Sequence, residues 1–161
     1  SDRYAKFGQI IGILPLANFE PAYVQDSLSR TGIVHSLEEI LPISDRAEYW
    51  IKNWYPDKMI YLNEAFDEEY YASLNDTEKS WLSQLCQVIK ESEHMNDDDI
   101  LGAVYAICHD EDKKVKKEKQ MRLFVIVYRL VVNEDSGPRL PLLIKTVGIE
   151  KMLELLGCNN L

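Results

Sequence analysis

The residues best suited to bind a ligand lie near the C-terminal end, where Ser136, Gly137, Pro138 and Arg139 follow a long apolar stretch. Gly and Pro favour the end of one helix and the start of the next, so the long helix is predicted to close at Gly137 and another to open behind it. The first turn of a helix presents unpaired N–H groups and a positive dipole end, which favour a phosphate or another polar ligand. We therefore predict a binding site at this turn, without a catalytic motif.

Arg139 is the strongest candidate in this turn, because a guanidinium can bond bidentately to a phosphate or to a base edge. The alternative is a structural role, since Glu134 and Asp135 are close enough in sequence to form an ion pair or a helix cap with it. Arg129 stands in an otherwise apolar stretch. We expect it to satisfy neighbouring loop carbonyls or a buried acid, because a buried charge must be paired.

Other chemistry is poorly represented in the sequence. The three histidines do not pair with one another, with cysteine or with carboxylates at zinc-binding spacing. Cys108, His109 and Asp110 are adjacent, and adjacent helical residues point about 100° apart, so they do not form a triad. No phosphate-binding GxxxxGK[ST] or GxGxxG loop is present. We predict no catalytic residue, no metal site and no cofactor in this chain.

The three cysteines, Cys86, Cys108 and Cys158, are an odd number at wide spacings. They suggest neither a disulfide framework nor a CxxC site, so we expect reduced thiols. Cys86 and Cys108 fall on apolar helical patterns and are predicted to be core side chains.

Charge is unevenly distributed along the chain. The net charge is −9, yet residues 113–161 alone carry 10 basic and 5 acidic side chains. The basic part therefore contains the Gly-Pro-Arg turn, and its densest section fits a rim that tracks phosphates. The alternative is a solvated helix start, which commonly carries such a run. The candidate contacts in this rim are Lys113, Lys116, Lys117 and Arg122. Near the N-terminus, Arg3 and Phe7 form a second candidate, in which base stacking and core packing are equally open.

Helices must position these residues, because apolar side chains recur at helical spacing along almost the whole chain. The sequence predicts an all-α fold, a compact bundle of about eight helices in one domain over residues 1–161. The stretch 123–132 is too apolar all round for a surface helix and should be central. Asn75 or Asp76 and Asn96 are predicted to cap helices, and residues 57–67 to form a loop. No apolar run is long enough to span a bilayer, and the start at Ser1 suggests a fragment of a longer polypeptide.

Taken in order, several segments resemble the C-terminal anticodon-binding domain of class I lysyl-tRNA synthetases, which is related to that of glutamyl-tRNA synthetases. These are Tyr4 to Gly12, Arg46 to Tyr49 with Asn53 and Trp54, the Leu82 and Leu85 helix, an Asp-rich helix start, and Gly137 to Arg139 with Phe124, Tyr128 and Gly148. The family's HIGH-like and KMSKS-like ATP signatures are absent. The resemblance thus implies a helical cage that binds RNA but cannot itself activate lysine.

The resemblance implies a partner and contact residues. In the related glutamyl enzymes the matching segment lies against the anticodon, which implies RNA contact by Ser136, Pro138, Arg139 and Leu140. The expected partners are the anticodon stem-loop of tRNA-Lys and a synthetase catalytic domain in cis. That parent would be a cytoplasmic, ATP- and Mg-dependent lysine-tRNA ligase. The competing hypothesis is an acidic helical protein-interaction module without RNA binding.

Overall fold

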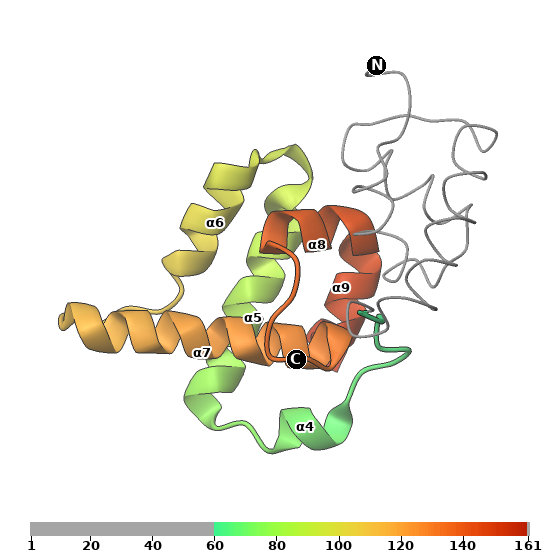
Figure 1. Ribbon diagram of the computed structural model, residues 1–161, viewed down its shortest axis with the longest axis horizontal. Coiled ribbons are helices and arrows are strands. Elements are labelled where there is room, and N and C mark those ends of the chain that lie inside the picture. The colour runs from blue at the N-terminus through green and yellow to red at the C-terminus, as the bar shows by residue number, and fades with distance from the viewer. Residues whose placement is uncertain (1–59, 161) are drawn as a thin grey trace, which may run out of the picture. The chain divides into compact units, whose positions relative to one another are not determined.

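The computed structural model describes residues 60–160, and every regular element among them is helical (Figure 1). Residues 60–67 form the predicted loop. The α-helices are α4 (Glu68–Ala72), α5 (Asp76–Glu91), α6 (Asp97–Tyr105), α7 (Lys113–Val132), α8 (Leu140–Val147) and α9 (Ile149–Leu155), with 3-10 turns η2 (Ser92–His94) and η3 (Cys158–Asn160). The all-α class is confirmed for this part of the chain, whereas the count of about eight helices includes segments outside it.

Local hydrogen bonds set where these helices begin. Asn75 and Glu78 form a capping box at the start of α5, in which each side chain accepts from the other residue's backbone N–H. The Asn96 side chain accepts from the N–H of Asp99 at the start of α6. Asp112 caps α7 by accepting from the N–H groups of Lys114 and Val115. The predicted caps at Asn75 and Asn96 are confirmed, because both side chains satisfy donors that a helix start leaves unpaired.

Helices α5 and α7 carry the core of the described residues. α7 crosses α5 (Figure 1), and α5 also packs against α6, α9 and η3. The apolar stretch of α7 is central, as predicted, because seven of its ten residues are buried. The buried side chains include Leu82, Leu85 and Ile89 of α5, Ile100 and Val104 of α6, Leu123, Ile126, Val127, Leu130 and Val131 of α7, and Met152 and Leu155 of α9.

The C-terminal end of α7 differs from the prediction. Asn133 closes the helix, with a left-handed backbone (φ 55°) and an N–H that donates to the carbonyl of Arg129. Asn63 caps the same end from 66 residues away, and its Nδ2 donates to the carbonyls of Arg129 and Leu130. Gly137 therefore does not end the long helix. Asn tolerates the left-handed conformation that usually selects Gly, so the helix can end at Asn133, four residues before Gly137.

The cysteine prediction was half right. Cys86 and Cys108 are buried, as expected. Cys86 is nevertheless joined to Cys158 by a disulfide, with α-carbons 5.9 Å apart, so the expectation of three reduced thiols was wrong. Their separation of 72 residues gave no hint of the bond. The pairing arises because α9 returns to α5 and carries η3 with it. Cys108 remains a thiol, and burial raises its pKa.

Residues 63–144 and 149–160 belong to one compact unit, and residues 60–62 and 145–148 to a second. The single domain predicted over residues 1–161 stays a prediction. Among the described residues no helix is long and apolar enough to cross a membrane.

Replacing Leu130 with Asp should unfold the chain. Leu130 has no exposed surface, and an unpaired carboxylate there would cost more than about 4 kcal/mol. Circular dichroism during heating should show no cooperative transition. Met121→Asp is the matched control, because Met121 lies on the same helix with 60% of its surface exposed. A Leu130→Asp protein that melts like the wild type would contradict the placement of α7 in the core.

An ion pair links α5 to α7 at the edge of the core. Arg122 Nε donates to Glu78 Oε2 at 2.6 Å, and 11% of the Glu78 side chain is exposed. Burial by itself would raise the pKa of Glu78, but the hydrogen bonds from Arg122 and from the Asn75 N–H, with the Arg122 charge, bring that pKa below its ordinary value. The charged pair therefore stabilises the fold at neutral pH.

Glu78→Gln should lower the free energy of unfolding by about 1 to 2 kcal/mol at pH 7. Gln keeps an oxygen for the Asn75 N–H, so the substitution tests the charge. Since the folded pKa of Glu78 is lowered, its contribution is complete above the unfolded pKa of about 4.3 and is lost as pH falls through the folded pKa. Urea titrations from pH 7 to pH 3 should show the two proteins converging in acid. A difference independent of pH would refute the assignment to charge.

Candidate nucleic-acid interface

A hollow of about 260 Å³ lies where α6, α7 and the turn before α8 meet. Leu101 and Tyr105 line it from α6, and Phe124 and Tyr128 from α7; Arg139 and Leu140 complete it. It therefore joins the predicted Gly-Pro-Arg turn to an aromatic wall.

The aromatic wall is continuous. The rings of Tyr105 and Phe124 meet edge to face, with centroids 5.5 Å apart. Phe124 stacks in turn beside Tyr128 at 6.5 Å. Tyr105 keeps 45% of its surface exposed, whereas Tyr128 is buried. The backbone of Tyr105 is held by Gln120, whose Nε2 donates to the Tyr105 carbonyl at 2.9 Å. The wall thus offers an exposed aromatic surface on a fixed support.

The turn is attached to α7 through Tyr128. The Tyr128 hydroxyl donates to the Pro138 carbonyl at 2.6 Å. Gly137 lies so close to the same ring that a Cβ there would stand 3.0 Å from Cδ1, closer than side chains normally approach. Burial raises the pKa of Tyr128, and the nearby Tyr105 raises it further. The phenol of Tyr128 therefore stays protonated and can donate its hydrogen bond. Tyr128 and Gly137 therefore position the segment that carries Arg139.

Arg139 is exposed at the N-terminal end of α8, and its carbonyl accepts the first helical hydrogen bond, from Leu143. Its guanidinium forms no ion pair or hydrogen bond within residues 60–160. The nearby acid Asp135 faces Arg129 instead, with 3.8 Å between Oδ1 and Nε. An ion pair between Arg139 and Asp135 is thus not found, and the guanidinium remains available to a ligand.

Arg129 has the structural role that the sequence predicted. Its Nη1 donates to the Asn133 carbonyl at 3.4 Å, and its Nε faces the exposed Asp135. Both partners lie in the loop after α7. Arg129 therefore supports this loop.

Most of the other predicted contacts that the structure describes do not line this hollow. Ser136 is exposed and Pro138 half-buried, but neither lines it. Leu140 lines it with a side chain that is only 1% exposed. Arg122 is held by Glu78. Arg3 and Phe7 lie outside the described residues. Of the predicted contacts within residues 60–160, only Arg139 and Leu140 thus line the hollow with the aromatic wall.

The lysines at the start of α7 are placed against the helix dipole. Lys113 and Lys117 are exposed and Lys116 is half-buried, and the first turn holds no acidic side chain. Cations at the positive end of a helix are unfavourable by a few tenths of a kcal/mol or more each. Asp110 pairs with Lys119 at 3.0 Å and leaves the other lysines without a bridge among the described residues. Helix stability does not explain this cluster, which is suited to an anion.

Sequence reasoning missed Leu101 and Tyr105. The apolar side chains Ile100 and Val104, which are buried, mark one face of α6 in the sequence. Leu101 and Tyr105 have the same i,i+4 spacing one residue further round the helix. That spacing could have indicated a second apolar face of α6. Only the fold shows that this face lies toward α7 and the turn with Arg139.

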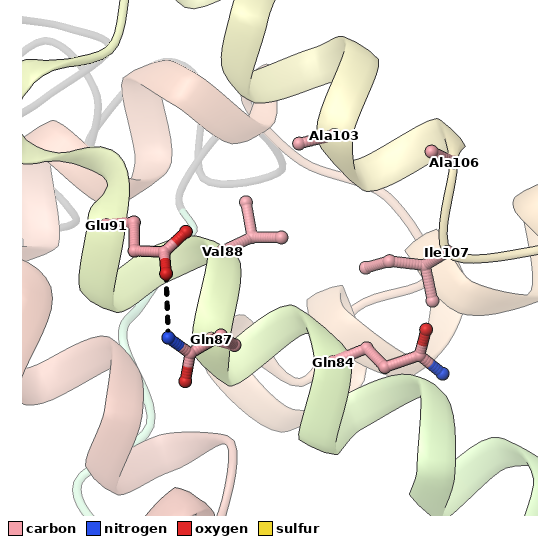
Figure 2. A pocket seen from close by; sticks show the side chains of 7 residues that line it. All are labelled: Gln84, Gln87, Val88, Glu91, Ala103, Ala106 and Ile107. Carbon is pink, nitrogen blue, oxygen red and sulfur yellow. Dashed lines mark hydrogen bonds between the residues drawn. The ribbon is translucent and has the colours of Figure 1, made fainter.

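A second hollow, of about 320 Å³, lies between α5 and α6 (Figure 2). Its polar side chains are Gln84, Gln87 and Glu91, and Gln87 donates to Glu91 at 2.8 Å across one helical turn. Ala103 of α6 faces them, together with Ala106 and Ile107 of the turn that follows α6. The hollow has no cationic side chain and does not suit a phosphate. Within residues 60–160, no three His, Cys, Asp or Glu side chains gather as they would for a metal ion.

Tyr128→Phe should lower the free energy of unfolding by about 1 kcal/mol, because it removes the hydrogen bond to Pro138. Urea denaturation followed by circular dichroism measures the change. Tyr105→Phe is the matched control, since the Tyr105 hydroxyl has no hydrogen bond among the described residues and its loss should change stability little. Equal stability of Tyr128→Phe and wild type would show that this hydroxyl does not hold the turn.

No protein-family model matches the chain. The chain is 30% identical over 136 residues to a Lysine--tRNA ligase of Streptomyces coelicolor. The matched part covers 77% of this chain, and the chain spans only 23% of the length of that relative. The similarity relates the chain to a region of an aminoacyl-tRNA synthetase.

Proposed function

We propose that the chain is the anticodon-binding part of a lysine-tRNA ligase and recognises the anticodon stem-loop of tRNA-Lys. The catalytic domain of the same polypeptide would then carry out the ATP- and Mg-dependent attachment of lysine, in the cytoplasm. The observation that carries the proposal is the unpaired Arg139 guanidinium beside an aromatic hollow, in a chain related to a Lysine--tRNA ligase. Unpaired RNA bases are recognised by stacking on aromatic side chains and by hydrogen bonds to their edges.

Two positively charged groups, Arg139 and the lysines at the start of α7, are suited to bind different parts of an RNA. Arg139 stands at the rim of the hollow, where a guanidinium can bond to a phosphate or a base edge. The lysines at the start of α7 form a second, sequence-independent contact with the backbone. Lys113 and Lys117 lie on the same side of α7 as Phe124 and Tyr128, because their spacings of three and four residues, or sums of these, follow the helical repeat. An RNA strand along this side would meet both features.

The acidic remainder of the chain limits where RNA can bind. Residues 1–112 hold 22 acidic and 8 basic side chains, so they repel a polyanion. Binding should therefore depend on the basic segment and weaken steeply with salt, as counterion release requires. The isolated chain should bind less tightly than a complete ligase, which also engages the rest of the tRNA.

A filter-binding titration tests the proposal. The chain is titrated against a lysine anticodon stem-loop at low and moderate salt, and against the same hairpin with altered anticodon bases. Retention that depends on the anticodon bases supports anticodon recognition. Equal retention of both hairpins would reduce the function to general RNA binding. No retention at low salt would reject RNA binding and favour the acidic interaction module.

Arg139→Ala should weaken binding of the lysine anticodon stem-loop by more than about tenfold, since a good bidentate contact contributes roughly 1 to 3 kcal/mol. The same titration measures the dissociation constant. Lys90→Ala is the control, because it removes one exposed positive charge from α5, and Lys90 does not line the hollow. Equal losses in the two variants would mean that net charge, and not contact by Arg139, sets the affinity.

A further inference from the structure

The hollow beside Arg139 contains two polar groups that no described residue satisfies. The Tyr105 hydroxyl and the Arg139 guanidinium both lack hydrogen-bond partners within residues 60–160, although other polar groups around them are paired. The Tyr128 hydroxyl is used by Pro138, and the Gln120 amide by the Tyr105 carbonyl. A ligand in the hollow would thus find one aromatic face and two free polar groups.

We propose that this hollow holds a single unpaired nucleobase, which stacks on Tyr105 while Arg139 bonds to its edge or to the adjoining phosphate. The inference rests on the proposed RNA-binding function and adds a residue, Tyr105, that sequence reasoning did not single out. Tyr105 would distinguish unpaired from paired bases, because only an unpaired base can stack on its ring.

Tyr105 is built as a stacking surface. Tyr105 is 45% exposed, and its ring is held by the edge-to-face contact with Phe124. Its backbone is fixed at the end of α6 by the hydrogen bond from Gln120. Little side-chain freedom is therefore lost when a planar ligand covers the free part of the ring, and base stacking on such rings is tolerant of sequence.

The chemistry of the hollow favours a base over an acidic peptide. A carboxylate would use Arg139 but would leave the aromatic wall without a partner. A nucleobase has a π-face for the Tyr105 ring, donors and acceptors on its edge for the guanidinium, and a phosphate nearby.

The approach to the hollow is also basic. Lys117 and Phe124 are about 10 Å apart along the axis of α7, at 1.5 Å per residue. An RNA strand whose phosphates contact the lysines can therefore place a following base in the hollow.

A double-mutant cycle tests this contact in the full 161-residue chain. Each loop nucleotide of the lysine anticodon stem-loop is replaced in turn by an abasic one, and the dissociation constants of wild type and Tyr105→Leu are compared. At one loop position, removal of the base should weaken wild-type binding at least about fivefold but Tyr105→Leu binding less than about twofold. Tyr105→Phe, which keeps the ring, should behave nearly as wild type. Tyr71→Leu, an aromatic loss on α4, should leave the wild-type pattern intact.

The outcomes separate the two ideas. If every abasic position weakens wild type and Tyr105→Leu equally, the base does not stack on Tyr105 and the inference fails, while RNA binding stands. If wild type binds no hairpin, the proposed function fails and the inference fails with it. Thermal melting of each variant checks that the fold is retained.

A second measurement does not depend on any variant. Hairpins with 5-iodouracil at single loop positions are irradiated in complex with the wild-type chain, and the crosslinked peptide is identified by mass spectrometry. A crosslink to Tyr105 or Phe124 from one loop position supports the pocket. Crosslinks that fall only outside residues 101–105 and 124–140 overturn it, even if Tyr105→Leu fails to fold.

Discussion

The apolar half of α7 is the constraint on which the rest of the described structure depends. Its buried side chains, from Leu123 to Val132, each stabilise the fold by about 1.5 to 3 kcal/mol when they leave water. Because α5 packs against α7, α7 cannot rotate about its axis without exposing these buried side chains. That fixes the direction of Phe124 and Tyr128, which lie on the edge of the buried face. The position of the candidate site is thus a consequence of core packing.

The features that the sequence predicted well are those governed by neighbours along the chain. Asn75 with Glu78 and Asn96 with Asp99 sit three residues apart, so the caps follow from local geometry. The apolar run in α7 is long enough to require burial from every side. Arg129 stands four residues before the carbonyl that it bonds. In each case the partner was visible within one helical turn.

The features that the sequence did not reveal depend on partners brought together by the fold. Glu78 and Arg122 are 44 residues apart, so their ion pair has no signal in the local sequence. RNA contact by Arg122 stays a prediction. Cys86 and Cys158 meet only because α9 folds back onto α5. Tyr105 belongs to no sequence motif. It is a candidate contact because it lines the same hollow as Phe124 and Arg139, which lie on other elements. Helix α7 ends at Asn133 and not at the predicted Gly137, because Asn as well as Gly can adopt the left-handed backbone conformation that ends a helix.

The disulfide has a topological consequence for the candidate site. Cys86 and Cys158 close a covalent ring that includes α6, α7, α8 and α9, and with them every side chain of the aromatic hollow. The exposed loop after α7, residues 133–136, is the kind of segment at which proteases cut, and it lies inside the ring. A single cut there opens the ring and leaves two peptides that the disulfide still joins, so no fragment is released. Tyr105 and Arg139 would then stay in one covalent molecule, even though the main chain between them is broken.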